Sequence, residues 1–155
     1  MDIRSVAPPR PAPALTGAWR FTAAPLDVAV PQIRHAVRDL LRRQQAPLSA
    51  DLLHGVLLIV SELVTNAVRH AALLTPVIGV EVRLEPGWVR LAVEDGHPYR
   101  PTALRVAPEQ ETTGGRGLLL VRATAESAGG DCGVEPTADG GKRTWAALPL
   151  DPARP

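Results

Sequence analysis

The chain has 155 residues, of which 45% are hydrophobic and 21% charged, a composition typical of one globular domain. Its formal net charge of +1 argues against nucleic acid as a direct partner, and its single cysteine, Cys132, excludes an internal disulfide and a cysteine-rich zinc site. The N-terminus lacks the apolar segment of a secretory signal, and we expect no apolar run to be long enough to span a bilayer. The chain is therefore expected to be cytoplasmic and to have no membrane partner.

The composition divides the chain into three parts. Residues 1–15 are rich in proline and lack hydrophobic periodicity, so we expect a disordered arm there. Residues 16–150 carry the predicted helices and strands and are expected to form a single domain. Residues 151–155 are expected to form a short tail.

The first half of the domain predicts one strand and two helices. The strand is expected over residues 19–22, and Asp27 is expected to cap a helix over residues 28–45. Arginines recur on one face of that helix, which makes the face a candidate contact for a homodimer or another protein. Ser49 is the natural N-cap of a second helix over residues 50–72, and the apolar residues of this helix leave so little room for a solvated face that we expect it to be buried.

The second half predicts two hairpins, with a long loop and a helix between them. Each hairpin has a glycine-containing turn between two runs of strand-forming residues. A loop as long as residues 95–113 is usually functional, often a lid, or else disordered. The order of the elements predicts an α+β fold, a two-layer α/β sandwich with a mostly antiparallel sheet and helices on one face. The elements expected in this half are strands 77–84 and 88–94, helix 118–128, and strands 131–135 and 142–148.

Four polar residues interrupt the apolar second helix in the stretch SELVTNAVRH. Glu62, Asn66, Arg69 and His70 stand one or two helical turns apart and form a single stripe. A polar stripe on a buried helix must find partners or face a cavity. The simpler interpretation makes Glu62 and Arg69 a helix-surface pair, and the stripe taken alone favours it. The functional interpretation makes the stripe the lining of a ligand site, with Asn66 as an oxygen ligand and Glu62 as a carboxylate base.

Two further motifs combine glycine with a charged residue. The stretch LAVEDG ends a strand in Asp95 and Gly96, where the carboxylate can accept a hydrogen bond from an amine such as that of adenine and the glycine permits close approach. In TTGGRGLLLV, glycines at the start of a helix leave backbone N–H groups for phosphate oxygens, and Arg116 can add a charge-assisted contact. A plain Asp-Gly turn and a glycine hinge are the alternative interpretations.

The three motifs, in this order, resemble the N, G1 and G2 boxes of the GHKL ATPase superfamily. The stretches that carry the resemblance are SELVTNAVRHA, VEDG and GGRGLLLV. Within the superfamily the chain is similar to the small bacterial anti-sigma-factor serine/threonine kinases, and the likeness covers residues 19–150. The chain departs from the family in the G1 box, which often reads Asp-x-Gly-x-Gly. Here the box reads DGHPY from Asp95 onward, so the first glycine is shifted and the second is missing.

The resemblance implies a Bergerat sandwich with MgATP held between the helical layer and the lid. It implies that Asn66 coordinates Mg²⁺, and that Glu62 is the general base or positions water. Arg69 and His70 would lie near the phosphates, and Asp95 would accept a hydrogen bond from the adenine amino group. The other residues implied to bind the nucleotide are Gly96, Gly115, Arg116, Gly117, Leu118 and Thr144.

The resemblance also implies a function. The chain would be an ATP-dependent kinase of the anti-sigma-factor type, which phosphorylates a serine or threonine hydroxyl of a small antagonist protein and sequesters a sigma factor. Mg²⁺ and ATP would be its cofactors. The alternative is a non-catalytic module that binds a protein partner and is gated by the nucleotide. Glu62 separates the two hypotheses, because only the kinase needs a catalytic carboxylate.

Overall fold

The computed structural model describes residues 16–71, 77–96 and 115–151. The expected N-terminal arm, nearly all of the expected lid and the last four residues of the expected tail lie outside the described residues. Within them, strands and helices follow the predicted order. They are β1 (Gly17–Ala23), α1 (Ala29–Arg43), α2 (Ala50–Ala71), β2 (Ile78–Glu85), β3 (Trp88–Asp95), α3 (Gly115–Ser127), β4 (Asp131–Pro136) and β5 (Lys142–Pro149).

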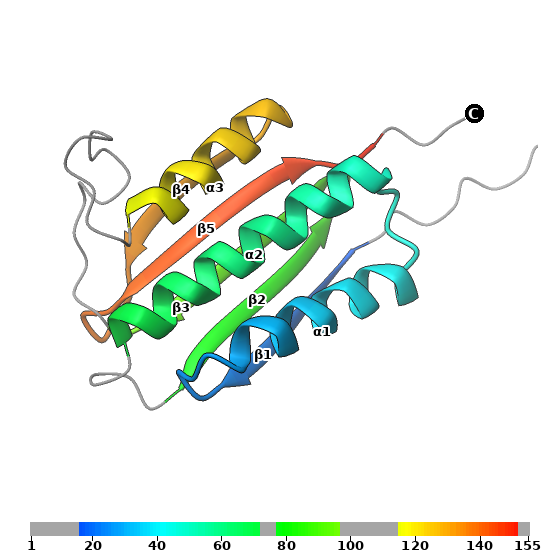
Figure 1. Cartoon of the computed structure of the whole chain (residues 1–155). Coiled ribbons are helices and arrows are strands. Elements are labelled where there is room, and N and C mark those ends of the chain that lie inside the picture. The colour runs from blue at the N-terminus through cyan, green and yellow to red at the C-terminus, as the bar shows by residue number, and fades with distance from the viewer. Residues whose placement is uncertain (1–15, 72–76, 97–114, 152–155) are drawn as a thin grey trace, which may run out of the picture.

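The described strands form one sheet in the order β1-β2-β3-β5-β4, and every neighbouring pair is antiparallel. The helices lie together on one face of this sheet (Figure 1), with α2 across its middle, α1 on the β1 side and α3 on the β4 side. The two hairpins, β2–β3 and β4–β5, meet where β3 pairs with β5. The predicted two-layer α+β sandwich is therefore confirmed.

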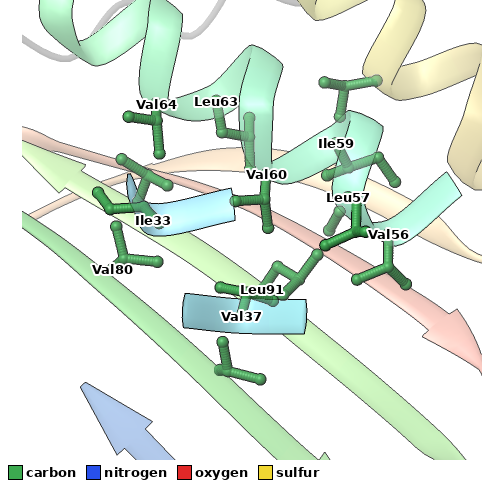
Figure 2. Close-up of a cluster of buried hydrophobic side chains, with 14 of the residues drawn as sticks. Ile33, Val37, Val56, Leu57, Ile59, Val60, Leu63, Val64, Val80 and Leu91 are labelled. Carbon is green, nitrogen blue, oxygen red and sulfur yellow. The ribbon is translucent and has the colours of Figure 1, made fainter. Parts of the chain in front are cut away.

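The hydrophobic core lies between α2 and the sheet. Alternate residues of β2 and β3 face the helices and are buried, as expected for strands that are covered on one face. Figure 2 shows Val60 of α2 in one cluster with Val80 of β2 and Leu91 of β3, and Ile33 and Val37 of α1 belong to the same cluster. Burying one such side chain stabilises the fold by roughly 1.5–3 kcal/mol. The whole cluster therefore holds α2 firmly against the sheet.

Helix α2 corrects one expectation about membranes. Among the described residues it is long and apolar enough to cross a bilayer, over Ala50–Arg69 with a mean hydropathy of 1.5, so the expectation that no apolar run reaches this length was wrong. Half of this segment is buried inside the fold. A helix that packs along the centre of a core has the same composition as a membrane span, because both must be apolar on most of their surface.

The two predicted helix caps have different outcomes. Ser49 caps α2 as expected, since its Oγ accepts the backbone N–H of Leu52 at 3.1 Å. Asp27 does not cap α1, which begins at Ala29 after Val28 and has no side-chain cap. A backbone turn replaces the cap, because the Asp27 carbonyl oxygen accepts the N–H of Val30 at 3.2 Å. The expectation of an Asp27 cap was therefore wrong.

The face of the sheet opposite the helices carries a network of charged side chains. Arg143 of β5 donates to Glu94 of β3 at 2.9 Å and to Glu81 of β2 at 3.2 Å. Arg20 of β1 donates to the other carboxylate oxygen of Glu94 at 3.1 Å. Glu94 thus joins the two arginines across the sheet.

We predict that the substitution Glu94→Gln destabilises the protein in a pH-dependent way. Burial opposes ionisation of Glu94, but hydrogen bonds and charge from Arg20 and Arg143 outweigh burial and hold the pKa of Glu94 below its usual 4.5. A lowered folded-state pKa means that the stabilisation is complete above the unfolded-state pKa and is lost as the pH falls through the folded-state pKa. Wild type should therefore exceed Glu94→Gln in unfolding free energy at pH 7, and the difference should shrink below about pH 4.5.

Urea denaturation at a series of pH values measures this difference. Glu126→Gln is the matched control, because Glu126 pairs with Arg122 on the exposed surface of α3 and exposed pairs contribute little. A Glu94→Gln deficit of the same size at pH 7 and pH 3 would contradict the prediction.

Candidate functional site

The termini of two helices and two strands lie together at one end of the sandwich. The C-terminus of α2, the C-terminus of β3, the N-terminus of α3 and the N-terminus of β5 lie at the same end, which is on the left in Figure 1. The register explains part of this meeting, because Asp95 at the end of β3 pairs with Lys142 at the start of β5. The three motifs singled out in the sequence stand on these ends.

Polar residues buried in the described parts of the chain gather at this end. Asn66 lies near the end of α2 and is only 6% exposed, and Thr144 of β5 is 3% exposed. Asp95 and Lys142 complete the buried polar set among the described residues. Buried polar and charged side chains are uncommon in an apolar core, so their concentration at one end of this core makes that end the candidate site for a polar ligand.

Glu62 lies half-buried between α2 and α3. Its Oε2 is 2.6 Å from the position that a Cβ on Gly117 would occupy. Glycine at this position therefore lets the first turn of α3 approach the Glu62 carboxylate. A carboxylate beside a helix N-terminus is stabilised by the helix dipole and by the free N–H groups of the first turn.

Lys142 and Asp95 form a buried ion pair. Nζ of Lys142 lies 3.9 Å from Oδ2 of Asp95, and the side chains are 8% and 2% exposed, respectively. Burial lowers the pKa of Lys142 from its usual 10.5, and the Asp95 charge offsets part of that effect. Sequence reasoning missed Lys142, although its signal was present. Lys142 and Thr144 stand two residues apart on one strand and so face the same side.

Gly141 allows the end of β3 to pass close to the start of β5. A Cβ at Gly141 would overlap the carbonyl oxygen of Asp95 and would lie 3.1 Å from the Cα of Gly96. Any side chain at Gly141 would therefore push the two strand ends apart. Gly96 itself is exposed directly after β3.

The glycine motif occupies a different position from the one expected. Helix α3 begins at Gly115, so Gly115, Arg116 and Gly117 form its first turn and do not precede the helix. The expected start at residue 118 was therefore too late. A first turn still leaves its N–H groups without partners inside the helix, so the donors that the motif was expected to offer remain available there. Leu118, also assigned to the site, is buried in the hydrophobic core.

The structure brings together only some of the predicted site residues. Glu62 stands against the first turn of α3, and Asp95 and Thr144 stand on adjacent strands of the helix-facing side. Arg69 is exposed near the end of α2, and His70 belongs to the last turn of that helix. Their roles remain predictions.

The described residues contain no cluster of three or more histidine, cysteine, aspartate or glutamate side chains that could hold a metal ion. A metal at this end would therefore take few ligands from these residues. Mg²⁺ behaves in this way, because it binds through one or two protein oxygens and keeps waters and substrate phosphates as its other ligands. The buried Asn66 side chain offers one such oxygen.

Comparison with known proteins places the chain in a family. The model of the histidine kinase-like ATPase domain matches residues 22–140. The chain therefore belongs to the histidine kinase-like ATPase family, and an ATPase domain implies a nucleotide site. No curated protein matches the chain in sequence.

Solved structures share the fold at low sequence identity. The RsbU and RsbW domains of Rv1364c from Mycobacterium tuberculosis align with 87% of this chain at 22% identity and a TM-score of 0.59, and the chain covers 33% of that protein chain. The SiaB–SiaC complex from Pseudomonas aeruginosa contains a chain that aligns with 88% of this one at 18% identity and a TM-score of 0.57, with 92% of that chain covered. The catalytic domain of the histidine kinase ThkA aligns with 86% at 19% identity and a TM-score of 0.56, with 99% of that domain covered.

We predict that Gly141→Ala destabilises the protein more than Gly117→Ala. The new methyl group at position 141 would meet backbone atoms that cannot turn away, at a cost of about 1–3 kcal/mol. At position 117 it would meet the end of the Glu62 side chain, which can rotate, and alanine favours a helix over glycine. Urea denaturation of both variants measures the difference. Equal losses of unfolding free energy would contradict this account of the strand ends.

Proposed function

We propose that this protein is an ATP-binding regulator of the anti-sigma-factor kinase type, which transfers phosphate to a serine or threonine hydroxyl of a small antagonist protein. The observation that carries the proposal is the collection of buried polar residues at one end of a histidine kinase-like ATPase domain. At this end, the Asp95 carboxylate could accept a hydrogen bond from the base and the Asn66 side chain could supply an oxygen to a metal. The N–H groups of the first turn of α3 could bind phosphates, and the Glu62 carboxylate could accept a proton.

The strand side of the site would hold the base. Asp95 can accept a hydrogen bond from the adenine amino group, and Thr144 lies on the adjacent strand where its hydroxyl can bond to the ring or to a water. Gly96 adds no side chain, so the ring can approach the backbone closely. The burial of Asp95 and Thr144 supports this assignment, since a flat base needs a dry surface to pack on.

The helix side of the site would hold the phosphates. The first turn of α3 offers the backbone N–H groups of Gly115 and Gly117. Arg69 and His70 on α2, and Arg116 on α3, would add positive charge near them. When bound, Mg²⁺ would neutralise phosphate charge, and Asn66 would supply its protein oxygen.

Glu62 would be the catalytic residue. Its carboxylate stands beside the first turn of α3, next to the N–H groups proposed to bind phosphate. There it can accept the proton of a partner's serine or threonine hydroxyl while the hydroxyl oxygen bonds to the γ-phosphorus and the bond to the β-phosphate oxygen breaks. ADP and the phosphorylated partner are the products.

The partner would be another protein in the cytoplasm. The RsbW likeness and the SiaB–SiaC complex support a protein partner, which here would be a sigma factor, its antagonist, or both. We propose no nucleic-acid or membrane partner. The arginine face of α1 remains the candidate surface for a homodimer or partner, although Arg34 already donates to Ser61 of α2 at 3.2 Å.

We predict that Asn66→Ala abolishes the Mg²⁺-dependent part of ATP binding. Loss of the metal-binding oxygen should weaken ATP affinity at least tenfold in Mg²⁺ and change it little in EDTA. Calorimetry with ATP in both buffers measures the effect. Thr65→Ala is the matched control, because Thr65 is the neighbouring residue on the helix and its hydroxyl already donates to the Ser61 carbonyl. Equal ATP affinity of wild type and Asn66→Ala in Mg²⁺ would refute the metal assignment.

We predict that Glu62→Gln retains ATP binding and loses phosphoryl transfer. The amide keeps the size of the carboxylate but cannot accept the proton, so the transfer rate should fall about 10²–10⁴-fold. Incubation with radiolabelled ATP, followed by capture of bound partners, measures the transfer. If wild type binds ATP and a partner but labels no protein, the kinase proposal fails and a nucleotide-gated binding module replaces it.

A further inference from the structure

Lys142 is a buried charge for which the proposed function gives no role. Its side chain is 8% exposed, and it lies on the helix-facing side of the sheet beside the proposed base site. A buried ammonium is costly unless it is paired or finds acceptors. Asp95 lies 3.9 Å away, whereas a charge-assisted hydrogen bond is about 2.7–2.9 Å long. The carboxylate therefore balances the ammonium charge without being a close hydrogen-bond acceptor for it.

Lys142 and Asp95 together present a donor beside an acceptor. They are opposite each other in the β3–β5 register, and Thr144 follows Lys142 on the same face. Gly141 allows the two strand ends to lie close together, and this fixes the position of the Lys142 backbone relative to that of Asp95. The Watson–Crick edge of adenine has the complementary order, because the N6 amine donates and the neighbouring N1 accepts.

We propose that Lys142 determines base specificity, donating from its ammonium to N1 of adenine while Asp95 accepts from the N6 amine. This inference rests on the proposed ATP site and adds to it a second side chain that contacts the base. Guanine in the same position places the O6 acceptor against the Asp95 carboxylate and the N1–H donor against the Lys142 ammonium. Both contacts are then repulsive, so the pair selects ATP over GTP.

A purely structural ion pair is the competing explanation. In that case Lys142 would only neutralise Asp95, and its replacement would lower stability or affect every nucleotide equally. The two explanations differ in one observable, the affinity ratio between ATP and an analogue that lacks only N1. If Lys142 is only structural, replacing it leaves that affinity ratio unchanged. If Lys142 donates to N1, replacing it brings the ratio to one.

Calorimetry with ATP and with 1-deaza-ATP, in which C–H replaces N1, tests the proposal. Wild type should bind 1-deaza-ATP about tenfold more weakly than ATP. Lys142→Met, which keeps an unbranched side chain one atom shorter and has no donor, should bind ATP about tenfold more weakly than wild type and should not distinguish the two nucleotides. Arg143→Met is the matched control, because Arg143 is the next residue on β5 and pairs with Glu94 on the opposite face. It should keep the wild-type ratio.

Four results would overturn the proposal. If wild type binds ATP and 1-deaza-ATP equally well, the protein has no donor to N1. This comparison uses wild type alone, so it does not depend on whether a variant folds. A Lys142→Met protein that keeps the wild-type ratio, or that binds ATP more tightly, shows that Lys142 does not contact N1. Wild type that binds neither nucleotide rejects the ATP site itself, and so the proposed function as well.

Discussion

The packing of α2 across the centre of the sheet is the constraint on which the helical part of the candidate site depends. Apolar residues of α2, among them Val60 and Leu63, fill the core against β2 and β3 and fix both the rotation and the height of the helix. The positions of the polar residues further along α2 are therefore set by the packing of these apolar residues. Asn66 is held in a buried position because its neighbours on the same face are held by the core. The site is therefore an extension of the core, and its rigidity derives from close packing.

Helix α3 is positioned by two glycines. Gly55 of α2 has Thr124 of α3 3.3 Å from where its Cβ would stand, and Gly117 of α3 approaches Glu62 of α2 in the same manner. The two contacts are two turns apart on each helix, so they define a line along which the helices approach closely. The first turn of α3 is brought to Glu62 as a consequence. Small residues thus set the distance between a carboxylate and the backbone donors that face it.

The buried charged groups at this end of the fold reduce its stability. An apolar residue at the Lys142 position would avoid the desolvation that lowers the pKa of the lysine. The Asp95 charge offsets only part of that cost, because the pKa of Lys142 stays below its usual value despite the pair. The charged network of Glu94 and Arg143 on the opposite face differs in degree, because its side chains are only partly buried and solvent reduces the cost of desolvating them.

Local sequence determined the elements, and tertiary structure decided how the site is assembled. Hydrophobic period and turn chemistry were enough to predict the helices, the hairpins, the Ser49 cap and the two-layer fold, because each depends on neighbours within a few residues. The motifs indicated Glu62, Asn66 and Asp95 as candidate site residues, and their roles remain predictions. The pairing of Lys142 with Asp95 depends on the β3–β5 register, which forms between segments far apart in the chain, so single-strand patterns could not predict it. The failed Asp27 cap has a local cause, since a backbone turn from Asp27 to Val30 forms where the side-chain cap was expected.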